Sequence, residues 1–213
     1  MLRWTSKKLI SIVGTGKTYL TSKIIDHLLK TTLPWEGLAY YYCKRTEGQR
    51  DEKPDDVIRS LFRQLAAPDQ NSKISKDVQS LFLQMKNKTS SPDINICKEQ
   101  LVKLVNEYSR TTIVLDALDE CDKRTRKVLF DFIDRLQSCS EKPIRVFFSA
   151  RPDPDIKKRF GDHCTIQTRT TDVNGDIRLL IEEKVKDIQC WNDMSEENQM
   201  ETVDKLLEKG AGM

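Results

Sequence analysis

The stretch Ser11-Ile12-Val13-Gly14-Thr15-Gly16-Lys17-Thr18 decides how the rest of the chain is interpreted. It follows the apolar pair Leu9-Ile10 and opens a run with helical spacing that continues through Leu29. Glycines between a strand and a helix let the backbone curl, so that successive N–H groups point at one anion. The positive end of the helix dipole adds to that field. The stretch therefore predicts a phosphate-binding loop.

The side chains of this loop have the chemistry that a nucleotide and its metal require. Lys17 would reach the β- and γ-phosphates, and the Thr18 hydroxyl would take one position on Mg²⁺. The loop residues before the helix would complete the nucleotide site: Val13, Gly14, Thr15 and Gly16. The pattern also asks for a glycine five residues before Gly16, where this chain has Ser11. At a positive φ, serine would cost more than glycine. The alternative is an ordinary strand–turn–helix that contains this motif by chance.

A second informative stretch is Thr111-Thr112-Ile113-Val114-Leu115-Asp116, followed by Ala117-Leu118-Asp119-Glu120. It predicts a buried strand with a carboxylate at its C-terminal tip, where ligands bind in open α/β sheets. Asp116 would hold Mg²⁺ through water, as a Walker B aspartate does. Asp119 or Glu120 would orient or deprotonate the attacking water. The alternative is a buried strand that runs into an acidic N-cap for the next helix.

A third stretch ends in an arginine. Residues Ile144–Ala150 are mostly apolar and predict another buried strand, and Arg151-Pro152 follows at its tip. From that position Arg151 would reach the γ-phosphate and report its presence. The alternative is a surface arginine before a proline turn.

The remaining segments predict amphipathic helices and two further strands. Apolar residues at helical spacing define inward faces in six segments: Val57 to Leu65, Ile74 to Met85, Ile94 to Val105, Val128 to Leu136, Ile177 to Val185, and Met200 to Leu207. The strands are expected at Leu38–Cys43 and Cys164–Thr168.

Composition excludes several classes of protein. The 213 residues suit one domain with a good core, and a net charge of +3 with interspersed signs does not favour nucleic acid. No apolar run is long enough to span a bilayer. Six scattered cysteines without a C-x-x-C pair indicate reduced thiols, and a cytoplasmic location is expected.

Four stretches carry a family resemblance: GTGKTYLTSK at 14–23, YYYCKR at 40–45, LDALDECD at 115–122 and FSARP at 148–152. They resemble fungal NACHT-type NTPase domains and, more narrowly, the nephrocystin-3-like N-terminal P-loop domain. The resemblance implies a STAND-class, three-layer α/β sandwich with a five-stranded, mainly parallel sheet flanked by helices. In that sheet the strand before Lys17 lies beside the strand before Arg151, and the Asp116 strand comes next.

The resemblance also implies a function. Such domains bind ATP or GTP with Mg²⁺ and hydrolyse the nucleotide slowly. They act as switches that control self-association or contacts with related NLR-like proteins. Nucleic acid and membrane are not expected partners. Residues 1–213 would form one such domain, truncated at both ends, without winged-helix region, effector domain or repeats. Two alternatives stay open: a nucleotide-dead interaction module, which Ser11 motivates, and a small-molecule kinase.

Overall fold

The computed structural model describes residues 7–12, 17–44, 53–67, 93–151, 153–160, 164–168 and 170–210. Its strands are β1 (Lys7–Ile12), β2 (Gly37–Tyr42), β3 (Thr111–Asp116), β4 (Ile144–Ala150) and β5 (Cys164–Thr168). Its helices are α1 (Lys17–Thr31), α2 (Pro54–Ala66), α4 (Ile94–Glu107), the 3₁₀ turn η1 (Leu118–Glu120), α5 (Lys123–Cys139), α6 (Pro154–Phe160), α7 (Thr170–Val185) and α8 (Glu196–Gly210). The helix expected from Ile74 to Met85 lies outside the described residues.

Within the described residues, the five strands form one sheet in the order β2-β3-β4-β1-β5. All the strand pairs are parallel. The expected neighbours are confirmed, because β1 lies beside β4 and β3 follows. Parallel neighbours put their carboxyl ends at the same edge of the sheet, so the tips of β1, β4 and β3 lie next to one another.

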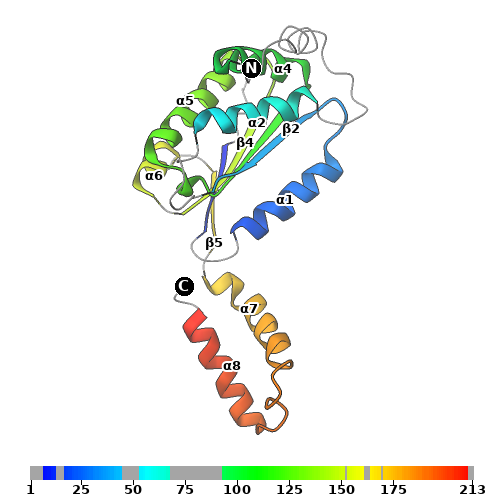
Figure 1. Ribbon diagram of the computed structural model, residues 1–213, viewed down its shortest axis with the longest axis vertical. Helices are drawn as coiled ribbons and strands as arrows, with labels where there is room; N and C mark the ends of the chain where they lie inside the picture. The colour runs from blue at the N-terminus through cyan, green and yellow to red at the C-terminus, as the bar shows by residue number, and fades with distance from the viewer. Residues whose placement is uncertain are drawn as a thin grey trace.

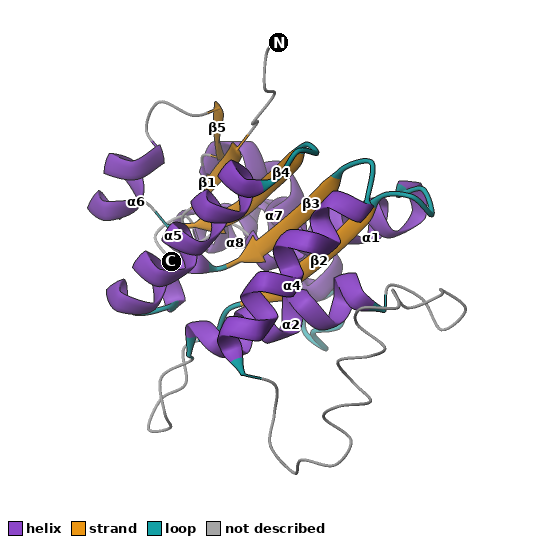
Figure 2. Cartoon of the chain, turned by 90° about the horizontal axis from the view of Figure 1, so that it is seen from above, coloured by secondary structure: helices purple, strands orange, loops and turns teal. Residues whose placement is uncertain are grey.

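The helices lie on both faces of this sheet. Figure 1 shows α1 on one side and α2, α4 and α5 on the other, and Figure 2 shows the same layers from above. Side chains alternate between the faces along each strand. Ile113 and Leu115 belong to the core cluster formed with α2, α4 and α5. Asp116 is therefore on the face that α1 covers.

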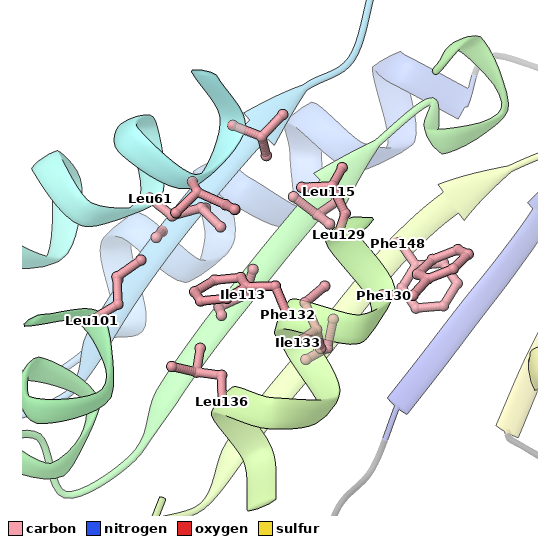
Figure 3. Packing of buried hydrophobic residues seen from close by; sticks show 14 of the residues in the cluster. Leu61, Leu101, Ile113, Leu115, Leu129, Phe130, Phe132, Ile133, Leu136 and Phe148 are labelled. Atoms are coloured by element: carbon pink, nitrogen blue, oxygen red, sulfur yellow. The ribbon is translucent and has the colours of Figure 1, made fainter. Parts of the chain in front are cut away.

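The main core lies between the sheet and α2, α4 and α5. Figure 3 shows Leu61 of α2, Leu101 of α4 and Leu129 of α5 converging on Ile113 and Leu115 of β3. These five side chains are 0–2% exposed. Burying a side chain of this size contributes about 1.5–3 kcal/mol. The core therefore covers one whole face of β3 and supports the strand that ends at Asp116.

Three inward faces were predicted only in part, among them that of α7, where the expected Leu180 is 55% exposed. Val128 was expected inside but is 39% exposed, while the neighbouring Arg126 is buried. In α8, Met200 is 63% exposed and Val203 is buried. Apolar spacing locates a helical face to within about one residue, and the contacting element then decides which residues are covered.

Helices α7 and α8 form a hairpin with a small core of its own. Val185, Trp191 and Val203 are buried together, and Arg178 pairs with Asp204 across the two helices. Figure 1 shows this hairpin below the sheet. Two helices that pack mainly on each other can each bury only one stripe, which explains the exposed Leu180 and Met200. No helix in the described ranges is both long and apolar enough to cross a bilayer.

The outer edge of β2 is closed by a side chain of α2. The Gln64 carboxamide accepts the Tyr40 N–H at 3.0 Å and donates to the Tyr40 carbonyl at 2.7 Å. It takes the place that the peptide group of another strand would take. Gln64 thus fixes α2 against the sheet edge and satisfies two backbone groups.

The beginning of β2 leaves no room for a side chain. A Cβ on Gly37 would lie 2.9 Å from Tyr108 Cδ2 and 3.0 Å from Leu65 Cδ2. Tyr108 cannot easily swing away, because its hydroxyl donates to the Leu65 carbonyl at 2.6 Å. Gly37→Ala should therefore lower the free energy of unfolding by about 1–3 kcal/mol, measured by urea denaturation.

Gly175→Ala is the matched control. Gly175 lies in α7, and nothing stands within 4 Å of its Cβ position. The same added methyl group should stabilise the protein by about 0.5–1 kcal/mol, because alanine is the better helix former. Equal effects at both positions would contradict the close packing at Gly37.

Candidate functional site

The candidate site lies at the edge of the sheet where the strands end. β1 ends at Ile12 and α1 begins at Lys17, so the predicted phosphate loop joins them. Four residues predicted to hold phosphate lie outside the described residues: Val13, Gly14, Thr15 and Gly16. The Lys17 side chain lies outside them as well. Thr18 is exposed on the first turn of α1. The backbone thus supplies the strand–loop–helix arrangement that the motif requires.

Ser11 lies inside β1 and not in a turn. Its register partners are Ala150 of β4 and Gln167 of β5, so it is paired on both sides. Among the described residues, Ala117 is the one non-glycine residue with a positive φ. The conformational freedom of glycine is therefore not needed at position 11. The cost that a positive φ would have for serine at position 11 therefore does not arise.

Asp116 is held from the neighbouring strand by a serine. The Ser149 hydroxyl donates to Asp116 Oδ1 at 2.5 Å, and both residues are 1% exposed. The same hydroxyl accepts the Ala117 N–H at 2.9 Å. A buried carboxylate destabilises the fold unless it is hydrogen-bonded, and the Ser149 hydroxyl supplies one such bond.

The backbone turns sharply directly after Asp116. Ala117 has φ 50° and ψ 46°, in the left-handed region, and is 4% exposed. An L-residue there costs roughly 1–2 kcal/mol. The turn leads the chain into η1, so that Asp119 and Glu120 follow within one turn of the Asp116 tip. Strain of this kind is concentrated at functional sites.

Asp119 and Arg151 contact each other. Asp119 Oδ1 accepts the backbone N–H of Arg151 at 2.9 Å, and Oδ2 lies 3.4 Å from Arg151 Nε. The Asp119 side chain is 11% exposed, whereas that of Arg151 is 65% exposed. The structure thus brings two predicted site residues together as an ion pair. Glu120 is on the exposed side of η1.

Tyr42 lies beside Asp116. Burial and then the Asp116 charge raise the pKa of the Tyr42 hydroxyl, with smaller contributions from Tyr40 and from Asp26 of α1. Tyr42 is the register partner of Asp116. The α1 side of the site therefore keeps a neutral tyrosine next to the carboxylate.

A buried arginine anchors the segment that follows Arg151. Arg126 of α5 is 3% exposed and its Nη2 lies 3.1 Å from Asp153 Oδ2 and 3.3 Å from Asp155 Oδ2. Burial raises the pKa of Asp155, while a hydrogen bond from Asp155 lowers the pKa of Asp153. Asp153 is therefore the stronger acid of the two carboxyls beside the guanidinium. This network fixes the chain just beyond Arg151.

The oxygen donors at the site fit Mg²⁺. The ion prefers carboxylate and hydroxyl oxygens together with water and phosphate. Asp116 offers a carboxylate at the strand tip, and Thr18 offers an exposed hydroxyl at the start of α1. The order of strands puts both on the same edge and the same face of the sheet.

Ser149 is the residue at this site that the sequence argument did not assign. It is a polar residue near the end of an otherwise apolar strand, at the position next to the tip. A serine there has to bond to something buried, and this could have identified it. Its partner depends on the register of β3 against β4, which a single sequence does not contain.

The helix that follows the site is capped by an aspartate. The Asp122 carboxylate accepts the N–H of Arg124 at 2.7 Å, the N–H of Thr125 at 3.0 Å and the Thr125 hydroxyl at 2.6 Å. These bonds, that of the Thr125 hydroxyl first, lower the pKa of Asp122. The carboxylate form therefore stabilises the start of α5.

Asp122→Ala should lower the free energy of unfolding by about 1 kcal/mol at pH 7. A carboxyl whose pKa is depressed in the fold gives stability that is present above its unfolded pKa, near 3.9, and lost as pH falls through the lower folded value. The difference between variant and wild type should therefore shrink below pH 4. Urea denaturation at pH 7 and below pH 4 measures this difference in the free energy of unfolding. A difference that does not change with pH would contradict the cap.

The strand order, the loop between β1 and α1 and the Asp116 tip define a P-loop NTPase-like α/β domain. The family model for the N-terminal region of nephrocystin 3 matches residues 5–151. This match covers more than half of the chain, and the chain belongs to that family. No curated protein matches the chain.

Solved structures of low sequence identity also match. AMPPCP-bound DnaA from Aquifex aeolicus is 16% identical with a TM-score of 0.43, and the match covers 96% of this chain and 50% of that one. A Walker-type ATPase of Pyrococcus abyssi is 10% identical with a TM-score of 0.48, at 83% and 53% coverage. The Aeropyrum pernix Orc1 protein in complex with DNA is 13% identical with a TM-score of 0.48, at 84% and 44% coverage. The chain spans about half the length of these proteins.

Proposed function

We propose that this chain is a nucleoside-triphosphate-binding switch domain of the NACHT type, with slow, Mg²⁺-dependent hydrolysis of ATP or GTP. The observation that carries the proposal is the convergence of three strand tips at one edge of the sheet. β1 leads into the phosphate loop, β3 ends at Asp116 and β4 leads into Arg151. A triphosphate with its metal needs these three elements side by side.

Each residue has a separate role in this proposal. The amides of residues 13–18 and the Lys17 ammonium hold the phosphates, as in other phosphate loops. Asp119 or Glu120 orients the attacking water. Arg151 contacts the γ-phosphate, and a guanidinium suits that task because its donors match phosphate oxygens.

The metal is held by two residues. Thr18 and Asp116 hold Mg²⁺, Asp116 through water. A bound Mg²⁺ supplies charge neutralisation at the phosphates. The chain's own contribution is to keep the Asp116 carboxylate buried and fixed at the strand tip.

The proposed binding partners are those expected of a nucleotide-dependent switch domain. Its binding partners are the nucleotide and either further copies of itself or related NLR-like proteins, as in the fungal STAND receptors that the sequence resembles. Its location is the cytoplasm, and it contacts neither nucleic acid nor membrane. Residues 1–213 act as one unit in this proposal.

Lys17→Ala should abolish nucleotide binding and leave the fold intact, because the ammonium is the loop's one side-chain charge on the phosphates. At 100 times the dissociation constant, Mg·ATP or Mg·GTP should stabilise wild type by about 2.7 kcal/mol. The variant should show no such gain. Thermal shift and calorimetry with each nucleotide measure this and identify the base.

Lys23→Ala is the control for charge. Lys23 lies on the same helix, with Nζ 5.3 Å from the exposed Tyr19 ring. Removing it takes away the same charge from α1 but should leave binding unchanged. A folded wild type that binds neither nucleotide would overturn the proposal in favour of an interaction module.

The Asp119–Arg151 pair gives a second prediction. Arg151 must leave Asp119 to reach a γ-phosphate, and an exposed ion pair stabilises by only about 0.2–1 kcal/mol. Asp119→Asn should therefore raise the affinity for a non-hydrolysable triphosphate by up to about fivefold. The affinity for the diphosphate should rise less, since it offers no γ-phosphate to Arg151.

A double-mutant cycle isolates the pair from simple charge repulsion. Removing the Asp119 charge near phosphates favours binding with or without Arg151, so that effect cancels in the cycle. In an Arg151→Ala background, Asp119→Asn should lose its specific gain for the triphosphate. Equal gains in both backgrounds would show that the pair has no part in recognising the nucleotide.

A further inference from the structure

Ser149 makes one donated and one accepted hydrogen bond, both to the Asp116 tip. Its hydroxyl donates to Asp116 Oδ1 at 2.5 Å and accepts the Ala117 N–H at 2.9 Å. All three residues are at most 4% exposed, so water does not compete for these bonds. With the N–H of Ala117 on its oxygen, the hydroxyl proton is directed at the carboxylate. The donor and acceptor roles are therefore fixed.

We infer that Ser149 is a positioning residue, which holds the Asp116 carboxylate in the orientation from which it acts on the metal. The inference rests on the proposed function. A carboxylate rotates readily about its last bond, and a bond to one oxygen fixes where the other oxygen points. The Ser149 bond engages Oδ1 and thereby sets the direction in which Oδ2 points.

The turn after Asp116 is held by the same hydroxyl. Ala117 is in the left-handed region, which an L-residue keeps only when the surrounding structure holds it. The bond from its N–H to Ser149 is one such restraint. Without it, both the carboxylate and the backbone at the strand tip would gain freedom. Ser149 therefore acts on the metal ligand in two ways.

The position of Ser149 adds a link to the other strands of the site. Ser149 is the register partner of Ile10 in β1, and Arg151 follows two residues later on the same chain segment. Ser149 therefore lies between the strand that leads into the phosphate loop and the Asp116 tip. Outer residues that orient metal ligands typically change metal affinity 10- to 100-fold when removed.

The test is the Mg²⁺ dependence of nucleotide binding. Wild type and Ser149→Ala are titrated with MgCl₂ at a fixed concentration of the non-hydrolysable β,γ-imido analogue of ATP or GTP, with binding followed by calorimetry. Ser149→Ala should need 10- to 100-fold more Mg²⁺ for half-maximal binding. Its affinity for the analogue in EDTA should equal that of wild type.

A matched pair of variants covers the case in which Ser149→Ala does not fold. Ser149→Thr and Ser149→Val have nearly the same shape, and only threonine keeps the hydroxyl. Threonine should keep a Mg²⁺ midpoint near that of wild type, and valine should raise it. The strain of the added bulk is common to both and cancels in the comparison.

The other outcomes are distinct. If wild type and all Ser149 variants share one Mg²⁺ midpoint, Ser149 does not position the ligand and the inference is wrong. If the variants lose affinity equally in EDTA and in Mg²⁺, Ser149 is a structural residue only. A folded wild type that binds no analogue at any Mg²⁺ concentration would overturn the proposed function, and this inference with it.

Discussion

The parallel pairing of β3 with β4 is the contact on which the rest of the structure depends. It places two apolar strands in the middle of the sheet, where α2, α4 and α5 cover one face and α1 approaches the other. Its register sets Leu115 beside Phe148. The next residue of each strand is then Asp116 and Ser149, so the polar end of the site follows from the apolar pairing before it. Buried parallel strands allow little slippage, because a shift by one residue would turn every side chain to the other face.

This arrangement also gives a buried carboxylate a partner. A buried carboxylate without hydrogen bonds would destabilise the fold. Asp116 instead meets a hydroxyl from the adjacent strand and ends a strand whose neighbours are rigid. Asp119 has a different environment, since it is near the surface and pairs with an exposed arginine. The carboxylate at the strand tip is thus bonded to a buried hydroxyl, and the carboxylate in the following turn to an exposed arginine.

The sequence predicted the elements better than it predicted their contacts. The strand at Ile144–Ala150 lies where it was expected, because buried parallel strands are almost continuous apolar runs. The edge strand Cys164–Thr168 also has the expected bounds. The order of strands came from the family resemblance and was confirmed. The bond from Ser149 to Asp116 depends on register, and the burial of Arg126 depends on where α6 begins. Such facts arise from pairs of distant segments and cannot be obtained from periodicity in either segment. The predicted roles at the phosphate loop remain predictions.

Gln64 has a consequence for how copies of this chain can meet. Edge strands are natural points of attachment for foreign strands. A carboxamide already bonded to both backbone groups of Tyr40 imitates a neighbouring peptide without extending into one. An incoming strand would have to displace it and would then meet α2. The β2 edge is thereby protected against strand addition at this point, and copies that meet there would contact each other through side-chain surfaces instead.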